Sequence, residues 1–338
     1  MQNGRDVRVA VLGAGRWGRN LVANLDALGA LAAVSDPDPA IRAELVATYG
    51  QRIAISAEHE RVLTDPALDA VVIATPATTH TSLAIEAVRA GKHVFVEKPF
   101  TLTVDDAELV VKEAEAAGRT LMVGHLLLYQ PAIVWMREFL QSGRLGWVAS
   151  LYQDRLSLGT VRTVENSLWS LGVHDVAAIL YLEGQEPIRI ATWGQAIIQP
   201  GVQDDMHLHM QFANGAEAHI HNSWLWPERR RRLTVVGTEA MAVYDELNQT
   251  VQLHRRRVNA NLSVQDDGGE VVFRGDPQPL RHELEHFLTC VRDGREPRSG
   301  GPSAIEVIRV LSQADAQMKE IRVLGQTSAR MTGIATSA

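Results

Sequence analysis

Short apolar runs alternate with helical stretches through the first third of the chain. The apolar runs are predicted strands and lie at Val7–Leu12, Leu31–Ser35, Ala70–Ala74, Val94–Val96 and Leu121–Val123. None of them alternates apolar with polar residues, which is typical of parallel strands buried on both faces. Gly29, Gly91 and Gly118 follow the helical stretches, where helices commonly end. Right-handed crossovers between such strands predict a doubly wound Rossmann sheet over about residues 5–125.

The rest of the chain is dominated by runs of period two. These runs are Val148–Leu156, Ile188–Ile198, Asp205–Phe212, Glu217–Leu225, Arg231–Val236 and Val251–His254. Asn214-Gly215 lies between two of them and predicts a two-residue type I′ hairpin turn. Helices are expected at Pro279–Arg292 and Pro302–Met318. The pattern predicts an α/β protein with a Rossmann domain over residues 1–124. An α+β domain with a large, mostly antiparallel open sheet is expected over residues 125–338.

Composition narrows the class of protein. The chain has 338 residues, of which 46% are hydrophobic, so it is expected to fold rather than to be disordered. Lys and Arg number 33 and Asp and Glu number 40, so the net charge is 33 − 40 = −7. This acidic balance disfavours nucleic-acid and membrane-surface partners. One cysteine, no signal-peptide pattern and no long apolar run favour a soluble cytoplasmic protein.

A glycine loop follows the first strand and precedes the first helix. Gly13, Gly15 and Gly18 have the spacing of a dinucleotide-binding turn. In such a turn the first glycine allows the tight turn, the second lets the backbone approach a pyrophosphate, and the third lets the helix pack closely on the strand. Asp36 ends the next strand, where a carboxylate accepts hydrogen bonds from the adenosine ribose and repels a 2′-phosphate. NAD is therefore favoured over NADP. The alternative is an ordinary glycine turn that binds no dinucleotide.

Glu97-Lys98-Pro99 ends the strand at Val94–Val96. Ligands of open α/β sheets bind beyond the carboxyl ends of the strands. A lysine at that position can polarise a substrate hydroxyl or help to deprotonate it. The alternative is a surface lysine that merely ends a strand.

These motifs together resemble the Gfo/Idh/MocA oxidoreductases. The resemblance is carried by the loop Gly13–Gly18 with Arg16 and Trp17, Asp36, Thr75-Pro76, His80, Ala90–Val94, Glu97–Pro99, Gly124-His125, Tyr129, His174-Asp175 and the helix near Leu280. It implies NAD(P)-linked oxidation or reduction at a sugar or cyclitol carbon, with Lys98 as the family's lysine. It also implies that the loop residues, Thr75, Pro76, His80, Glu97 and Lys98 bind the cofactor. A substrate pocket on one face of the second sheet and a homodimer or homotetramer are implied as well.

A finer resemblance covers residues 155–175. Arg155–Arg162, Glu165–Ser170 and His174-Asp175 are similar to the WlbA-type nucleotide-sugar 3-dehydrogenases, which oxidise UDP-linked N-acetylglucosamine or its uronic acid. The resemblance implies substrate contacts from Lys98, Tyr129, Arg155, Arg162, Asn166, Trp169 and His174. Two positions depart from the pattern. Ser170 stands where many members have Asp, and Val173 stands where the subgroup has Pro.

His174 is the candidate general base. The pKa of a histidine is ordinarily about 6.5, so its imidazole can accept a proton near neutral pH. The residue lies just before the apolar run Val176–Leu182, and a helix N-terminus there favours the neutral imidazole. Asp175 is adjacent and could orient this imidazole, although neighbouring residues of a helix do not face one another. The alternative is a structural histidine.

Two histidine patterns suggest a metal and are interpreted otherwise. His282-Glu283-x-x-His286 matches a zinc-protease motif, but both histidines are predicted to point away from the helix's apolar stripe, and no third histidine follows. The second pattern comprises His207, His209, His219 and His221. A two-residue turn would place His207 and His209 on one face of the sheet and His219 and His221 on the other, so one metal could not bind all four and we expect no metal there.

The sequence predicts an NAD-dependent dehydrogenase of a sugar, most specifically of a UDP-N-acetylglucosamine-type nucleotide sugar. Lys98 and His174 are the predicted catalytic residues, and hydride leaves the carbon whose hydroxyl they deprotonate. A dehydrogenase of a free sugar, inositol or another polyol is the first alternative. An NAD-bound regulator without catalysis and a zinc peptidase are the others.

Overall fold

The computed structural model describes residues 6–276 and 278–331, and the chain divides into two compact units. The first unit comprises the chain up to Gln130 together with Gln278–Ile308. The second comprises the chain between these two pieces and the chain from Arg309 onward. The sequence predicted a single boundary between the two domains, near Gly124, whereas each unit is made of two segments of the chain. The segment Gln278–Ile308 belongs to the first unit because its helix α8 (Pro279–Asp293) packs on α1 (Gly18–Ala27) and on the short helix η2 (Leu126–Tyr129).

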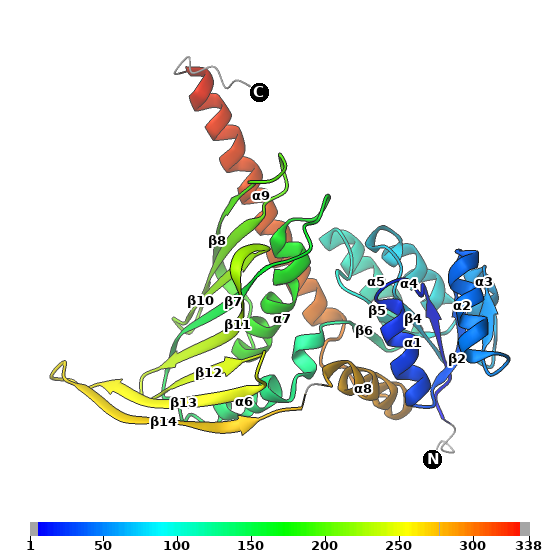
Figure 1. The fold of residues 1–338 in the computed structure, drawn as a ribbon, viewed down its shortest axis with the longest axis horizontal. Coiled ribbons are helices and arrows are strands. Elements are labelled where there is room, and N and C mark those ends of the chain that lie inside the picture. The colour runs from blue at the N-terminus through cyan, green and yellow to red at the C-terminus, as the bar shows by residue number, and fades with distance from the viewer. Residues whose placement is uncertain (1–5, 277, 332–338) are drawn as a thin grey trace. The chain divides into compact units, whose positions relative to one another are not determined.

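The first unit contains a six-stranded parallel sheet in the order β3-β2-β1-β4-β5-β6 (Figure 1). The strands are β1 (Val9–Leu12), β2 (Leu31–Ser35), β3 (Ala54–Ser56), β4 (Ala70–Ile73), β5 (His93–Val96) and β6 (Leu121–Val123). Every residue of β1 and β4 is buried, which confirms the predicted doubly wound sheet. The strand order reverses between β1 and β4, and ligands of such sheets bind beyond the strand ends at that point. The short, partly exposed β3 was not predicted.

Helices cover both faces of this sheet. Besides α1 and α8, they are α2 (Pro39–Tyr49), α3 (His59–Leu63), the 3₁₀ turn η1 (Ala77–Thr79), α4 (His80–Arg89) and α5 (Val104–Ala117). α4 packs on α5, whereas α1 packs on α8. Thr103 caps α5 by accepting a hydrogen bond from the amide of Asp106 at 3.1 Å, and Gly118 ends it at φ +62°.

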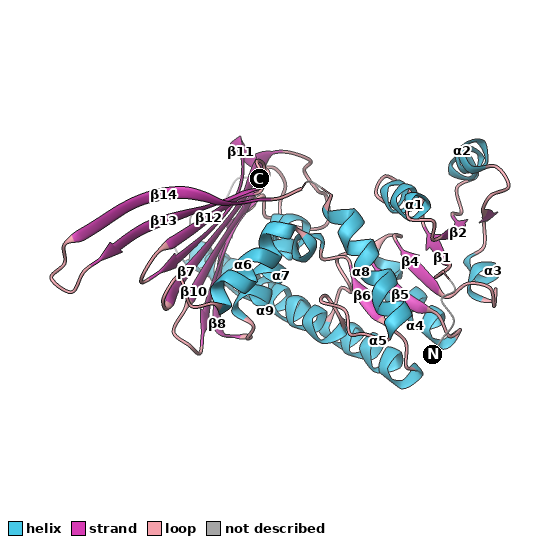
Figure 2. Ribbon diagram, turned by 90° about the horizontal axis from the view of Figure 1, so that it is seen from below, coloured by secondary structure: helices cyan, strands magenta, loops and turns pink. Residues whose placement is uncertain are grey.

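The second unit is built on an eight-stranded sheet in the order β14-β13-β12-β11-β7-β10-β9-β8. The strands are β7 (Val148–Leu158), β8 (Pro187–Gln195), β9 (Asp205–Phe212), β10 (Glu217–Ser223), β11 (Leu225–Gly237), β12 (Met241–Asp245), β13 (Thr250–Val258) and β14 (Val264–Arg274). Only the β7–β10 pair is parallel, which confirms the predicted mostly antiparallel sheet. Figure 2 shows α6 (Pro131–Gln141) and α7 (Val173–Glu183) on one face of this sheet. Gln317 of α9 (Gly301–Met331) donates a hydrogen bond to the carbonyl of Ile190 in β8.

The hairpin between β9 and β10 differs from the prediction. The amide of Gly215 donates to the carbonyl of Phe212, and the amide of Phe212 donates to that of Ala216, so the loop has three residues. A type I′ turn needs a positive φ at both central residues, but only Gly215 has one (φ +85°). The register therefore shifts by one residue.

The shifted register pairs His209 with His219 and His207 with His221. The prediction that His207 and His209 lie on the opposite face from His219 and His221 is wrong, because directly paired residues, and residues two apart on one strand, lie on the same face.

Within residues 6–276 and 278–331, no helix combines the length and the apolar character needed to cross a membrane.

Candidate functional site

The glycine loop after β1 forms a tight cradle. Gly13 has φ +88°, and a Cβ on it would lie 2.9 Å from the carbonyl oxygen of Ala74. A Cβ on Gly18 would overlap the carbonyl oxygen of Gly13. A Cβ on Gly15 would meet no atom within 4 Å, so the backbone there faces open space. The loop therefore suits a pyrophosphate approaching the N-terminus of α1, and these residues fit NAD.

The side chain of Asp36 is hydrogen-bonded to the glycine loop. It is buried at the end of β2, where its Oδ2 accepts a hydrogen bond from the amide of Ala14 at 2.7 Å. Its Oδ1 accepts from the amide of Asp38 at 2.9 Å, so the carboxylate is held against the glycine loop. Arg42 also lies here and donates to the carbonyls of Asp36 and Pro37 at 2.8 and 2.7 Å. Arg42 was not predicted at this position, because it lies within α2 and not among the three residues that directly follow Asp36.

His80 joins the two loops that follow β4 and β5. It is buried, with Nδ1 2.8 Å from the carbonyl oxygen of Pro99 and Nε2 2.9 Å from that of Thr75. Burial lowers the pKa of His80, although the two carbonyls oppose this effect. The Thr75 and Thr79 hydroxyls are 2.7 Å apart. His80 therefore positions the Thr75-Pro76 and Lys98-Pro99 segments relative to each other.

Lys98 lies beside a buried carboxyl group. The Trp17 indole N–H donates to Glu97 Oε1 at 2.6 Å, and the Lys98 amide donates to Glu97 Oε2 at 3.2 Å. Burial raises the pKa of Glu97 to about 7, while these bonds and the Lys98 charge oppose the rise. His125 is also fully buried, and burial together with the Lys98 charge lowers the pKa of its imidazole to about 4. Trp17 and Arg16 themselves are exposed.

The H-E-x-x-H motif on α8 does not gather metal ligands. Glu283 is buried, and burial followed by the charge of Glu97 raises its pKa well above the usual range. His286 instead accepts a hydrogen bond from the amide of Arg298 at 3.1 Å and lies 3.4 Å from the sulfur of Cys290. In the described part of the chain, the groups of three side chains able to hold a metal lie elsewhere.

Replacing Glu283 with glutamine is expected to raise the free energy of unfolding at pH 8. The raised pKa means that the folded state binds a proton more tightly than the unfolded state. Stability from this proton is fully present below the unfolded pKa of about 4.3 and is lost as pH rises through the folded pKa. Glutamine does not titrate, so the variant does not lose this stability at high pH. Its higher free energy of unfolding relative to wild type should therefore become smaller as pH falls toward 5.

Urea denaturation at pH 5, 6.5 and 8 measures this difference. Glu285→Gln is the matched control, because Glu285 lies on the same helix, is partly exposed and pairs with Arg281 at 2.9 Å. A Glu283→Gln protein less stable than wild type at pH 8 would contradict the assignment of a destabilising buried carboxyl.

His174 lies near the start of α7, but the helical segment begins earlier than predicted. A π-helical turn (η3, Leu168–Gly172) runs directly into α7. His174 therefore follows a helical turn, and its predicted position at a free helix N-terminus is wrong. The prediction placed the helix on the apolar run that begins at Val176, and the polar residues His174 and Asp175 directly before this run hid the earlier start of the helix. π-helical turns are frequent at functional sites.

Asp175 and Arg155 are paired inside the second unit. Arg155 Nε donates to Asp175 Oδ1 at 2.8 Å, and Arg155 Nη2 donates to Glu246 Oε2 at 2.9 Å. Asn222 Nδ2 also donates to Asp175 at 2.7 Å. Burial raises the pKa of Asp175 despite the charge of Arg155. Burial alone would raise the pKa of Glu246, but Arg155 and Arg231 outweigh it and lower that pKa.

The guanidinium of Arg155 is thus held by protein carboxylates, and its role as a substrate contact stays a prediction. The Asp175 carboxylate accepts hydrogen bonds from Arg155 and Asn222.

The segment before His174 is attached to α9 through Asp315. Asn166 Nδ2 donates to Asp315 Oδ1 at 2.9 Å, and the Trp169 indole N–H donates to Asp315 Oδ2 at 2.8 Å. Asn166 Oδ1 accepts from the Trp169 amide at 3.0 Å. Both side chains are buried, so these predicted substrate contacts are directed into the protein. Asp315 was not predicted, since it carries no motif within its helix.

The remaining predicted substrate contacts differ in exposure. Tyr129 is buried, its hydroxyl 2.8 Å from Ser299 Oγ, and burial raises its pKa. Arg162 is exposed, 3.3 Å from Glu165 and from Ser170 Oγ. Lys98 and His174 are half-buried. Lys98, His174 and Arg162 are therefore the predicted contacts that retain access to solvent.

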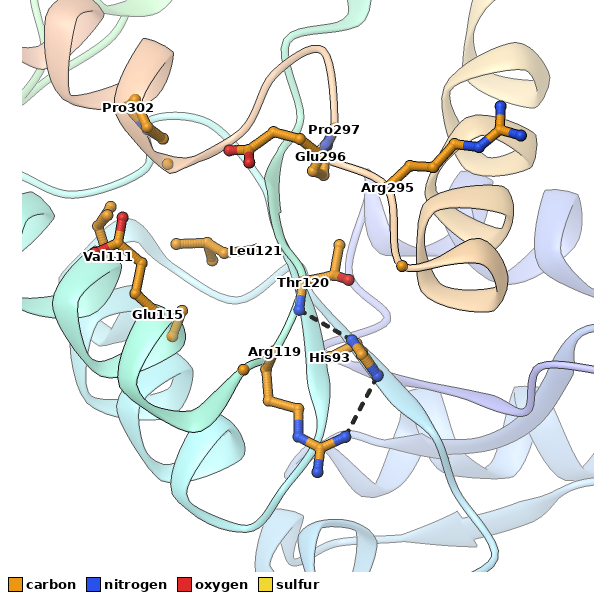
Figure 3. A pocket seen from close by; sticks show the side chains of 14 residues that line it. His93, Val111, Glu115, Arg119, Thr120, Leu121, Arg295, Glu296, Pro297 and Pro302 are labelled. Carbon is orange, nitrogen blue, oxygen red and sulfur yellow. Dashed lines mark hydrogen bonds between the residues drawn. The ribbon is translucent and has the colours of Figure 1, made fainter. Parts of the chain in front are cut away.

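A hollow of about 270 Å³ lies at the other end of the parallel sheet (Figure 3). It is lined by residues that begin β5 and β6, including His93, whose Nδ1 accepts from the amide of Thr120 at 2.9 Å. Burial and the charge of Arg119 lower the pKa of His93. Because Lys98 follows the carboxyl end of β5, this hollow is not part of the candidate site.

Comparisons with known proteins agree with this arrangement. Residues 7–125 match the model of an oxidoreductase family, Gfo/Idh/MocA, with an NAD-binding Rossmann fold, and residues 133–243 match the Gfo/Idh/MocA C-terminal domain. The chain is 29% identical over 308 residues to UDP-N-acetylglucosamine 3-dehydrogenase of Acidithiobacillus ferrooxidans, covering 91% of this chain and 96% of that protein. Its solved structure, named GnnA, superimposes with a TM-score of 0.81 at 28% identity over 92% of this chain and 97% of that one.

Two further proteins are similar over most of their length. The scyllo-inositol 2-dehydrogenase (NAD(+)) of Bacillus subtilis is 29% identical over 86% of this chain and 88% of that protein. A solved oxidoreductase structure from Magnetospirillum magnetotacticum has a TM-score of 0.80 at 30% identity, covering 91% of this chain and 99% of that one.

Proposed function

Because the chain belongs to the Gfo/Idh/MocA oxidoreductase family, we propose that it is an NAD-dependent sugar dehydrogenase acting on a nucleotide sugar. The substrate we propose is a UDP-linked N-acetylglucosamine or its uronic acid, oxidised at the 3-hydroxyl. The observation that carries this proposal is the similarity to UDP-N-acetylglucosamine 3-dehydrogenase, which extends over 91% of the chain and includes both units.

NAD, when bound, supplies the hydride acceptor. Gly13, Gly15 and Gly18 hold its pyrophosphate at the start of α1, and the Asp36 carboxylate accepts hydrogen bonds from its ribose. Arg16, Trp17, Thr75, Pro76, His80 and Glu97 complete or position this binding region. The Trp17–Glu97 hydrogen bond supports the proposal, since it couples the glycine loop to the residue before Lys98.

The Lys98 ammonium donates a hydrogen bond to the substrate hydroxyl and stabilises negative charge as it develops on that oxygen. His174 accepts the hydroxyl proton. Arg162, which is exposed, is the basic side chain we assign to the substrate's phosphates. Each of these three side chains performs a step for which an accessible cation or imidazole is required.

A free polyol is the second candidate substrate. The similarity to scyllo-inositol 2-dehydrogenase, at 29% identity, favours it. The second observation in its favour is that Arg155 is paired with Asp175 and Glu246, which engages one of the two arginines expected to contact the substrate.

Reduction of NAD followed at 340 nm tests both candidates. The purified protein is assayed with UDP-N-acetylglucosamine, its uronic acid, N-acetylglucosamine without UDP, and myo- and scyllo-inositol. Faster reduction with a UDP-sugar than with the same sugar lacking UDP is the expected result. If NAD were reduced only with the polyols and not with the UDP-sugars, the nucleotide-sugar assignment would be overturned.

A further inference from the structure

Four histidines of the second unit lie together on one face of the large sheet. β9 and β10 pair His207 with His221 and His209 with His219. The paired rings are stacked, with centroids 3.9 Å apart in the first pair and 4.7 Å apart in the second. The buried residues of β10 alternate with these histidines, so the imidazoles lie on the face opposite the buried one.

A carboxylate accompanies the first pair. Asp205, His207 and His221 form what we term the Asp205 cluster. His221 Nε2 lies 3.2 Å and His207 Nε2 3.4 Å from the Asp205 carboxylate oxygens, and the three ligand atoms are all within 4.8 Å of one another. Ligands at zinc's usual bond lengths of 2.0–2.2 Å in a tetrahedron are about 3.3 Å apart. The side chains therefore already have nearly the spacing that an ion requires.

A second carboxylate accompanies the other pair. His209, Glu217 and His219 form the Glu217 cluster, again with ligand atoms within 4.8 Å of one another. His209 Nε2 lies 3.4 Å and His219 Nε2 3.9 Å from Glu217 Oε2. His209 Nε2 is buried, and it makes no hydrogen bond within the part of the chain that the structure describes. An unsatisfied imidazole nitrogen facing a carboxylate is suited to share a cation with it.

The protonation states suit metal binding as well. Burial, followed by the neighbouring histidine, lowers the pKa of His207 and of His219, so both imidazoles are neutral near pH 7. Hydrogen bonds from His221 and Ser223 outweigh burial and lower the pKa of Asp205, and the hydrogen bond from Gln211 lowers that of Glu217. Neutral imidazoles and ionised carboxylates are the forms that coordinate metals.

The two clusters are separate sites. They lie two residues apart along each strand, which is about 6.7 Å, whereas the ions of a two-metal centre are about 3.5–4 Å apart. Each cluster offers three ligands, which leaves one tetrahedral position open. Beside the Asp205 cluster, a cavity of about 400 Å³ is lined by apolar side chains, including Trp193, Ile197 and Met318. Asp205 and His207 also line that cavity.

We propose that the Asp205 and Glu217 clusters each bind one divalent transition-metal ion through two imidazoles and a carboxylate. This donor set suits Zn²⁺, Co²⁺, Ni²⁺ and Cu²⁺ better than Ca²⁺ or Mg²⁺, which prefer oxygen ligands. The proposal does not depend on the dehydrogenase activity, because the six ligands are not among the residues assigned to NAD or to the sugar.

Calorimetric titration of untagged, chelator-treated protein with Zn²⁺ tests the proposal. We expect two ions per chain for wild type, and one for His207→Ala or for His219→Ala. Both histidines are partly exposed, at 55% and 38% of the side chain, so the variants are expected to fold. His254→Ala is the control and should still bind two ions, since His254 belongs to neither cluster. Titration with Co²⁺ should give the intense visible absorption of a tetrahedral site.

Circular dichroism melts of each variant confirm that it is folded before titration. Wild-type protein should melt at a higher temperature with Zn²⁺, and His207→Ala/His219→Ala should not. No uptake by wild type, or uptake unchanged in the double variant, would overturn both sites and leave the clusters as hydrogen-bonded imidazole–carboxylate pairs. Uptake of one ion that only one variant abolishes would overturn the other site.

Discussion

Replacing Lys98 with alanine is expected to lower the turnover number of the dehydrogenase on its sugar by ~10²-fold or more. The ammonium group stabilises an alkoxide that exists only as hydride departs, so its loss raises the barrier without removing a ground-state contact of comparable strength. NAD affinity should change little, because the glycine loop and Asp36 supply that binding. Steady-state kinetics with the best substrate of the UDP-sugar and polyol screen measure turnover, and fluorescence titration measures NAD affinity.

Lys112→Ala is the control for Lys98→Ala, since Lys112 is an exposed lysine of α5 in the same unit. A companion variant, His174→Ala, should show a loss of similar size that imidazole in the buffer partly restores, as expected when a missing base is replaced. Full activity of Lys98→Ala would remove the lysine from the mechanism. Full activity of His174→Ala would do the same for the base.

The sequence was sufficient for the first unit because the relevant signals are local. The positions of Gly13, Gly15 and Gly18 depend on one strand–turn–helix: a Cβ would clash at Gly13 and Gly18, and the backbone of Gly15 faces open space. Continuous apolar runs likewise predicted a buried parallel sheet. The return of α8 to this unit was not predictable from periodicity, because its partner, η2, is far from it along the chain.

Register was harder to predict than strand identity. Both strands of the β9–β10 hairpin were predicted, but the backbone angles at Asn214 decided whether the loop had two or three residues. Asn214 instead accepts a hydrogen bond from the Ala216 amide through its side chain. That single difference moves four histidines to one face and creates two clusters whose existence the sequence argued against.

The partners of the candidate site residues were not predictable where they lie far away along the chain. Arg155 and Trp169 were assigned to the substrate because their motif was recognised, yet their polar atoms bind Asp175, Glu246 and Asp315. Glu246 and Asp315 lie 91 and 146 residues from the side chains they hold. A buried ion pair of this kind follows from tertiary packing, which one sequence does not reveal.

Replacing Asp175 with alanine is expected to lower the free energy of unfolding by about 3–5 kcal/mol. Asp175 is fully buried and accepts hydrogen bonds from Arg155 and Asn222, so its removal leaves a buried guanidinium and a buried amide without those partners. Glu246 still pairs with Arg155, so the expected loss of free energy is that of removing one of the two carboxylates that hold the guanidinium. Urea denaturation monitored by circular dichroism measures the difference.

Two further variants separate charge from hydrogen bonding. Asp175→Asn keeps an acceptor for Arg155 but removes the charge, so its loss should be smaller than that of the alanine variant. Glu113→Ala breaks the Arg89–Glu113 pair, whose arginine side chain is 64% exposed, and should lower the free energy of unfolding far less than Asp175→Ala does. If Asp175→Ala costs no more than Glu113→Ala, then the Arg155 network does not stabilise the second unit. In that case Arg155 is available for the substrate contact that its motif suggested.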